Sequence, residues 1–176
     1  MGDRPAKKDS LYPIDKLQML RSHLFVPSKR EYVRGKRPQV ECILCDIVAG
    51  RDTVDRLEVF RDDIFAVSLN LHPYNSGHLM IFPLRHLEDP RDMSHDEVMR
   101  LHRMQCMCFD VLQRRYHPSG FNVGYNYGEA SGASIRHFHL HVVPRYFREL
   151  GFMDILGGAK IIVEDPMETM TDLRER

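Results

Sequence analysis

Three histidines alternate with apolar residues in the stretch HFHLHVVPR, residues 137–145. Successive side chains of a β-strand point to opposite faces, so His137, His139 and His141 are expected on one face, with the intervening apolar side chains buried behind them. Packing alone gives no reason to gather three hydrated rings. A chance run of half-exposed histidines and a metal-binding strand are the alternative interpretations. The stretch therefore predicts a strand that carries chemistry on one face and hydrophobic core on the other.

The composition is that of an ordinary globular protein. A chain of 176 residues predicts one domain with a terminal extension. Its 25 basic residues equal its 25 acidic ones, so nothing indicates capture of a nucleic acid polymer or a membrane surface. No apolar stretch is long enough to span a bilayer, and the polar N-terminus lacks the apolar core of a signal peptide. These features predict a cytoplasmic protein.

The order of elements predicts an α+β domain in which one long helix packs on an antiparallel meander. Strands are expected at 57–60, 64–69, 78–82, 121–127 and 136–144. Helices are expected at 14–25, at 42–50 and from a Ser94–Glu97 capping box to residue 116. The basic segment 28–38 is either a solvated linker or an arm that attracts phosphate or embraces a second subunit.

A small-residue loop, GEASGASIRH at 128–137, leads directly into the histidines. Small residues let the backbone approach a ligand closely, and consecutive amides can hold phosphate oxygens. The Ser134 hydroxyl stands just before the histidines, where it can donate to a phosphoryl or leaving-group oxygen. A neutral imidazole held at one nitrogen presents the other for attack. The loop and strand together predict phosphoryl or nucleotidyl transfer through a covalent histidine intermediate.

These segments resemble the histidine triad (HIT) superfamily of nucleotide hydrolases and transferases. HFHLHVV is similar to its His-φ-His-φ-His-φ-φ pattern, where φ is apolar. NSGHLMIFP (75–83) and GFNVGYN (120–126) resemble its nucleotide-facing strand and the strand before its phosphate loop. The resemblance covers 41–147 and implies the HIT fold, in which each subunit has a five-stranded antiparallel sheet with one long helix and two sheets join across a homodimer. Residues 1–40 are then an N-terminal arm with a short helix, and 148–176 a C-terminal tail.

The resemblance also implies a role for each residue of the site. His139 would be the nucleophile that takes the nucleoside monophosphate group, and His141 would contact the α-phosphate and assist proton transfer. His137 and His78 would support and orient these rings. The nucleotide-binding set would further comprise Asn70 at the ribose hydroxyls and, around the phosphates, Asn126, Gly132, Ala133 and Ser134. Taken alone, Asn70 and Asn126 are equally well explained as turn or strand-end caps.

Cys42 and Cys45 form a C-x-x-C pair, which indicates metal binding or redox chemistry in a reducing compartment. HIT proteins with such a pair resemble this chain, and the resemblance implies a structural zinc held by Cys42, Cys45, His86 and His137. The alternative is two buried cysteines and a surface histidine. No organic cofactor is expected.

The most similar subgroup comprises proteins like diadenosine tetraphosphate phosphorylase. Residues 20–33 resemble its lead-in but lack both aromatic anchors, and residues 148–152 depart from its stretch after the triad, which puts phosphorolysis specifically in doubt. The resemblance therefore implies an enzyme that cleaves dinucleoside polyphosphates or related phosphoanhydrides, with water or phosphate as acceptor.

Three other hypotheses stay open from the sequence. The chain is a nucleoside phosphoramidase of the same superfamily, a hydrolase whose three triad histidines bind a catalytic zinc, or a nucleotide-binding module without turnover. Chelation would abolish the activity of a zinc hydrolase. A binding module would bind AMP but would never form a covalent adduct at His139.

Overall fold

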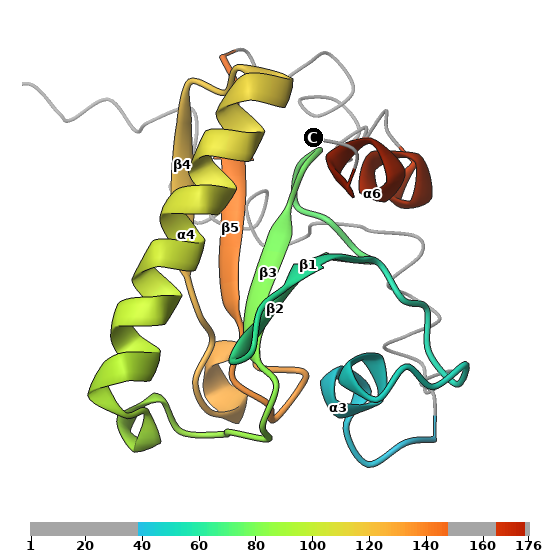
Figure 1. Ribbon diagram of the computed structural model, residues 1–176, viewed down its shortest axis with the longest axis vertical. Coiled ribbons are helices and arrows are strands. Elements are labelled where there is room, and N and C mark those ends of the chain that lie inside the picture. The colour runs from blue at the N-terminus through green and yellow to red at the C-terminus, as the bar shows by residue number, and fades with distance from the viewer. Residues whose placement is uncertain (1–38, 148–164, 175–176) are drawn as a thin grey trace, which may run out of the picture. The chain divides into compact units, whose positions relative to one another are not determined.

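The computed structural model describes residues 39–147 and 165–174. A five-stranded antiparallel sheet with strand order β1-β2-β3-β5-β4 forms the centre of this part (Figure 1). The strands are β1 (Glu58–Arg61), β2 (Phe65–Leu69), β3 (Leu79–Pro83), β4 (Gly120–Gly124) and β5 (Leu140–Arg145). The helices are α3 (Ile43–Val48), α4 (His95–Tyr116) and α6 (Pro166–Arg174), with short 3-10 turns at Pro90–Asp92 and Glu129–Ser131. The predicted α+β class and five-stranded sheet are confirmed.

The two faces of the sheet have different partners because side chains alternate along each strand. From β3 and β5, Leu79, Ile81, Leu140 and Val142 join one core cluster, which includes α4. The residues between them face the other side, where Met80 pairs in register with His141. A second, smaller cluster forms there between the sheet and α3. The sheet thus separates the main core from the face that carries the histidines.

The long helix α4 covers the first face. The predicted capping box is present, since the Ser94 hydroxyl accepts from the backbone N–H of Glu97 and the Glu97 carboxylate accepts from that of Ser94. Met104, Cys108 and Leu112 recur at helical spacing and are buried against the sheet. The helix ends at His117, whose left-handed φ of 47° caps it.

Two predicted strand limits are wrong by three or more residues, and the others that differ do so by one residue. The histidine strand begins at Leu140 rather than at residue 136, because the backbone N–H of Phe138 bonds to the Leu87 carbonyl beyond the end of β3. The strand predicted to reach residue 127 ends at Gly124, and Tyr127 instead donates its hydroxyl to Asp89. Pro83 is the last residue of β3 rather than the residue after it, a position where its missing N–H is tolerated.

Helix α6 lies in the region predicted only as a tail. It packs against β1 and β2, buries Met170 and Leu173, and forms an ion pair from Asp172 to Arg115 of α4. The predicted helix at 14–25, the basic segment 28–38 and residues 148–164 lie outside the described residues.

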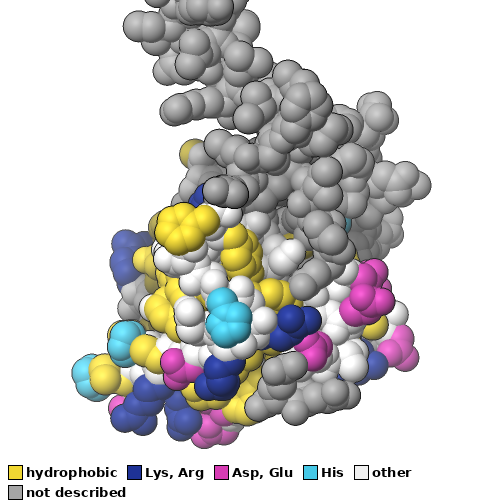
Figure 2. All heavy atoms as spheres, turned by 90° about the horizontal axis from the view of Figure 1, so that it is seen from above, with side chains coloured by type: hydrophobic (Ala, Val, Ile, Leu, Met, Phe, Trp, Pro, Cys, Tyr) yellow, Lys and Arg dark blue, Asp and Glu magenta, His cyan; other side chains and the backbone are white. Residues whose placement is uncertain are grey.

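No helix in the described ranges is long and apolar enough to cross a membrane. Among the described residues that Figure 2 shows, basic and acidic side chains are interspersed with hydrophobic ones.

Candidate active site

A pocket of about 430 Å³ opens on the sheet face that carries the histidines. Strand β2 contributes Ser68 and Leu69, β3 contributes Met80, and the histidine segment contributes His139 and His141. The remaining lining residues come from α3 and the surrounding loops: Ile43, Leu44, Ile47, Val54, Asp55, Leu57, Asn70, Leu71, His72, Tyr74, Asn126, Gly132, Ser134 and Ile135.

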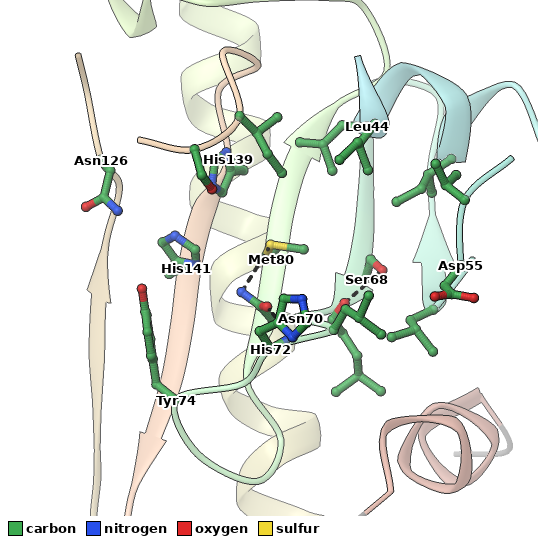
Figure 3. Close-up of a pocket in the computed structure, with 18 of the residues that line it drawn as sticks. Leu44, Asp55, Ser68, Asn70, His72, Tyr74, Met80, Asn126, His139 and His141 are labelled. Carbon is green, nitrogen blue, oxygen red and sulfur yellow. Dashed lines mark hydrogen bonds between the residues drawn. The ribbon is translucent and has the colours of Figure 1, made fainter. Parts of the chain in front are cut away.

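The pocket has a polar end and an apolar end. Figure 3 shows His139, His141 and Asn126 at one end, with Leu44 and Asp55 toward the other. The apolar end is built by residues of α3 and the Met80 side chain, while Asp55 is an exposed carboxylate at its rim. Such a pocket suits a flat apolar group with a charged group attached at one end.

A chain of hydrogen bonds fixes the proton positions on two histidines. The backbone N–H of Tyr74 donates to Nδ1 of His78 at 3.1 Å, so neutral His78 carries its proton on Nε2. That Nε2 lies 3.0 Å from Nδ1 of His141, which must accept. A neutral His141 therefore carries its own proton on Nε2 and acts as a donor there.

His139 has the opposite tautomer. Its Nδ1 lies 2.7 Å from the backbone carbonyl oxygen of His137, which can only accept, so the proton is on Nδ1. The lone pair is left on Nε2 of a ring that lines the pocket. The His139 and His141 ring centroids are 4.8 Å apart, at an interplanar angle of 83°. An electron-pair donor and a proton donor thus stand side by side.

Burial favours the neutral form of His78 and of His139. It is the largest cause that lowers the pKa of His78 from 6.5 to about 3, and the nearby His141 and His139 add to the shift. Burial also lowers the pKa of His139, while the His137 carbonyl partly offsets it. A nucleophilic nitrogen at His139 is therefore available below neutral pH.

The four predicted metal ligands do come together. The ligand atoms of Cys42, Cys45, His86 and His137 all lie within 4.8 Å of one another. His137 Nδ1 is 3.4 Å from Cys42 Sγ and 3.5 Å from Cys45 Sγ, and His86 Nδ1 is 3.3 Å from Cys45 Sγ. Thiolate and imidazole ligands of a tetrahedral zinc are about 3.5 Å apart, so the donor set and its spacing fit this ion.

Both imidazoles of this cluster also have partners of the kind that orient metal ligands. His137 Nε2 is 3.0 Å from the Pro83 carbonyl oxygen, and His86 Nε2 is 3.4 Å from a Glu88 carboxylate oxygen. Such contacts leave Nδ1 of each ring for the ion. The His137 side chain therefore belongs to the cysteine cluster, and it supports His139 through its carbonyl. Because the three triad rings do not converge, this arrangement argues against a trihistidine zinc.

The structure brings most of the predicted nucleotide-binding residues to the pocket. Asn126, Gly132 and Ser134 line it, whereas Ala133 is not among the lining residues. Asn70 lines the pocket and accepts from the backbone N–H of His72 at 2.8 Å, which is a turn contact; its role at the ribose stays a prediction. Gly132 has a φ of 84°, a conformation that favours glycine.

The sequence alone did not identify several lining residues. The wall from α3, the exposed Asp55, the buried Ser68 and the Tyr74 loop were all missed. The two apolar residues between Cys42 and Cys45 gave one signal, because a turn between two predicted metal ligands is expected to hold its side chains in fixed positions.

Comparison with known proteins agrees with this geometry. Residues 51–148 match the HIT domain. AP-4-A phosphorylase of Mycobacterium tuberculosis is 39% identical over 107 residues, which cover 60% of this chain and 55% of that protein, so the chain spans about half the length of this relative. Protein hit of Bacillus subtilis is 27% identical over 111 residues, covering 63% of this chain and 75% of that protein.

Solved structures give the same result. The Zn-bound histidine triad family protein from Mycobacterium smegmatis superposes with a TM-score of 0.63 at 26% identity, covering 77% of this chain and 91% of that one. The sheet, the alternating histidines and the matched residues lead to one conclusion. The chain belongs to the HIT domain family.

Proposed function

We propose that this protein cleaves nucleoside phosphoanhydrides by transferring a nucleoside monophosphate group to Nε2 of His139. One observation carries the proposal: the hydrogen bond from His139 Nδ1 to the His137 carbonyl, which leaves the Nε2 lone pair on a pocket-lining ring. The neighbouring donor, His141, supports it.

The transfer begins when the His139 Nε2 lone pair attacks the α-phosphorus of the substrate, the phosphorus of the nucleoside monophosphate group that will be transferred. A P–N bond forms, and the P–O bond to the departing nucleotide breaks, its electron pair leaving on oxygen. The Nε2–H of His141 donates to that oxygen and offsets the developing charge. The proton on His139 Nδ1 stays in place, where the His137 carbonyl stabilises the cationic adduct.

The adduct is then resolved by an acceptor. An oxygen of water or inorganic phosphate attacks phosphorus, the P–N bond breaks and its electron pair returns to Nε2. A water acceptor releases one proton to the solution. Dinucleoside polyphosphates are the favoured substrates because the Mycobacterium tuberculosis relative is named as an AP-4-A phosphorylase. In this scheme the base occupies the apolar end near Leu44, the ribose lies by Asn70, and the phosphates lie at the histidines.

We also propose that Cys42, Cys45, His86 and His137 hold a structural zinc ion. Zinc there supplies a cross-link between α3, the end of β3 and the start of the histidine segment. A homodimer is proposed as well, since β4 is an edge strand with exposed side chains, including Val123. Light scattering that shows a monomer would contradict the dimer.

The test is a rapid-quench experiment with diadenosine tetraphosphate, with and without phosphate, that follows products and intact protein mass. The expected result is an AMP adduct that His139→Ala abolishes and that the control His102→Ala, on the exposed side of α4, retains. ATP leaves in the first step; ADP as the second product in the presence of phosphate marks a phosphorylase, and AMP as the second product with or without phosphate marks a hydrolase. Turnover by His139→Ala would overturn the assigned nucleophile, and AMP binding without any adduct would favour a binding module.

A further inference from the structure

His137 takes part in two sites at once. Its ring contacts both thiols of the cysteine cluster, and its carbonyl holds Nδ1 of His139. The side chain is 1% exposed, and the Pro83 carbonyl fixes its second nitrogen. The next residue, Phe138, is anchored by its N–H to Leu87. The Phe138 N–H belongs to the same peptide unit as the His137 carbonyl, and Leu87 follows the cluster residue His86, so the peptide that selects the tautomer of His139 is connected to two residues of the cluster.

Helix α3 makes a second connection between the two sites. Cys42 is its N-cap and accepts from the backbone N–H of Cys45, so both thiols belong to the first turn. Ile43 and Leu44, the two residues between them, line the pocket. A helix of six residues is too short to be stable alone, so its place depends on what it packs against and on the cluster.

The pocket and the cysteine cluster nevertheless share no side chain. None of the four cluster residues is among those that line the pocket in the described part of the chain. A nucleotide in the pocket therefore does not meet an ion in the cluster, and any effect of one on the other passes through His137 and α3.

We propose that metal binding at the cluster and nucleotide binding in the pocket strengthen each other, with His137 as the positioning residue that joins them. The proposal rests on the proposed function for the identity of the nucleotide. An ion that holds His137 and the first turn of α3 fixes the orientation of the His139 ring and the position of the pocket-lining residue Leu44 before the nucleotide binds. The nucleotide then binds without ordering either of them.

Linkage makes the effect reciprocal. If zinc raises the affinity for AMP by some factor, AMP raises the affinity for zinc by the same factor. Coupled sites in proteins change each other's affinity by about 5-fold to 150-fold. A change of about tenfold in AMP affinity is expected here, because the ion would position both His139 and the pocket-lining residues of α3.

The experiment measures AMP affinity by calorimetry for the zinc-loaded and zinc-free full chain, and zinc affinity by chelator competition with and without AMP. Both ratios are expected to be about tenfold and equal to each other. Cys45→Ser is expected to lose the AMP-affinity gain on zinc addition, whereas Cys106→Ser, which removes an exposed thiol on α4, retains it. The ¹⁵N signal of His139 Nδ1 is expected to shift when zinc is removed.

Each outcome bears on the proposal. Equal AMP affinities with and without zinc, in protein that keeps its circular dichroism and its turnover, overturn the coupling and leave the proposed function intact. Absence of AMP binding to the zinc-loaded chain overturns both. If the zinc-free chain unfolds, cobalt-loaded protein takes its place: AMP must then shift the cobalt absorption bands, and unchanged bands overturn the coupling.

Discussion

The buried His78 predicts a specific loss of stability in acid. Its side chain is 0% exposed, and burial lowers its pKa from 6.5 to about 3. Between pH 6.5 and about pH 3, the imidazole of residue 78 therefore binds a proton in the unfolded chain but not in the folded chain. Folding free energy from this group is fully present above pH 6.5 and is lost as the pH falls from 6.5 toward 3.

The size of the effect follows from the two pKa values. At pH 4.5 the unfolded imidazole is almost fully protonated and the folded one is neutral, which lowers the free energy of unfolding by about 3 kcal/mol relative to pH 7.5. This is a large fraction of the 5–15 kcal/mol that holds a typical domain together. The lowered pKa of His139 acts in the same direction.

Urea unfolding at pH 7.5 and 4.5, for wild type and His78→Gln, measures this contribution. The variant is expected to be less stable at pH 7.5 and to lose about 3 kcal/mol less between the two pH values than wild type. Asn75→Ala is the control: it removes a buried side chain that donates to the Pro144 carbonyl, and it should lower stability without flattening the pH dependence. Equal pH slopes for wild type and His78→Gln, or an NMR titration of His78 near pH 6.5, would refute the reasoning.

Three further predictions concern the glycines, α6 and the cysteine cluster. Gly77→Ala should lower the free energy of unfolding in urea by about 3 kcal/mol, because φ is 77° and an added Cβ lies 3.0 Å from side-chain atoms. Gly128→Ala, where φ is 80° and the space around the Cβ is open, should lower it by about 1 kcal/mol. Equal losses would contradict the contact argument. Leu173→Ala should cost about 2–3 kcal/mol because the side chain is buried against the sheet, and the exposed Met167→Ala should change little; a negligible loss at 173 would show that α6 does not belong to the core. Cys42→Ser should lower bound zinc per chain, measured by atomic absorption, while unchanged zinc content would disprove the assignment.

Local patterns in the sequence were sufficient for much of this fold. Alternation at Leu140 and Val142 placed them in the core, and His139 and His141 on the opposite face, because the side-chain period of a strand depends on the backbone alone. The start of α4 followed from Ser94 and Glu97, whose capping contacts span a single turn. The resemblance to HIT proteins added the residues that would form the site.

Tertiary structure decided what depends on the order of the strands. His137 and Cys42 are 95 residues apart, and they meet because β5 lies next to β3 and α3 docks on the same face. The pattern therefore did not show that the His137 ring turns to the cysteines while its carbonyl serves His139. Alternation assigns a side chain to a face, but only the packed sheet determines which distant group it meets there, because contacts between distant segments depend on the whole topology.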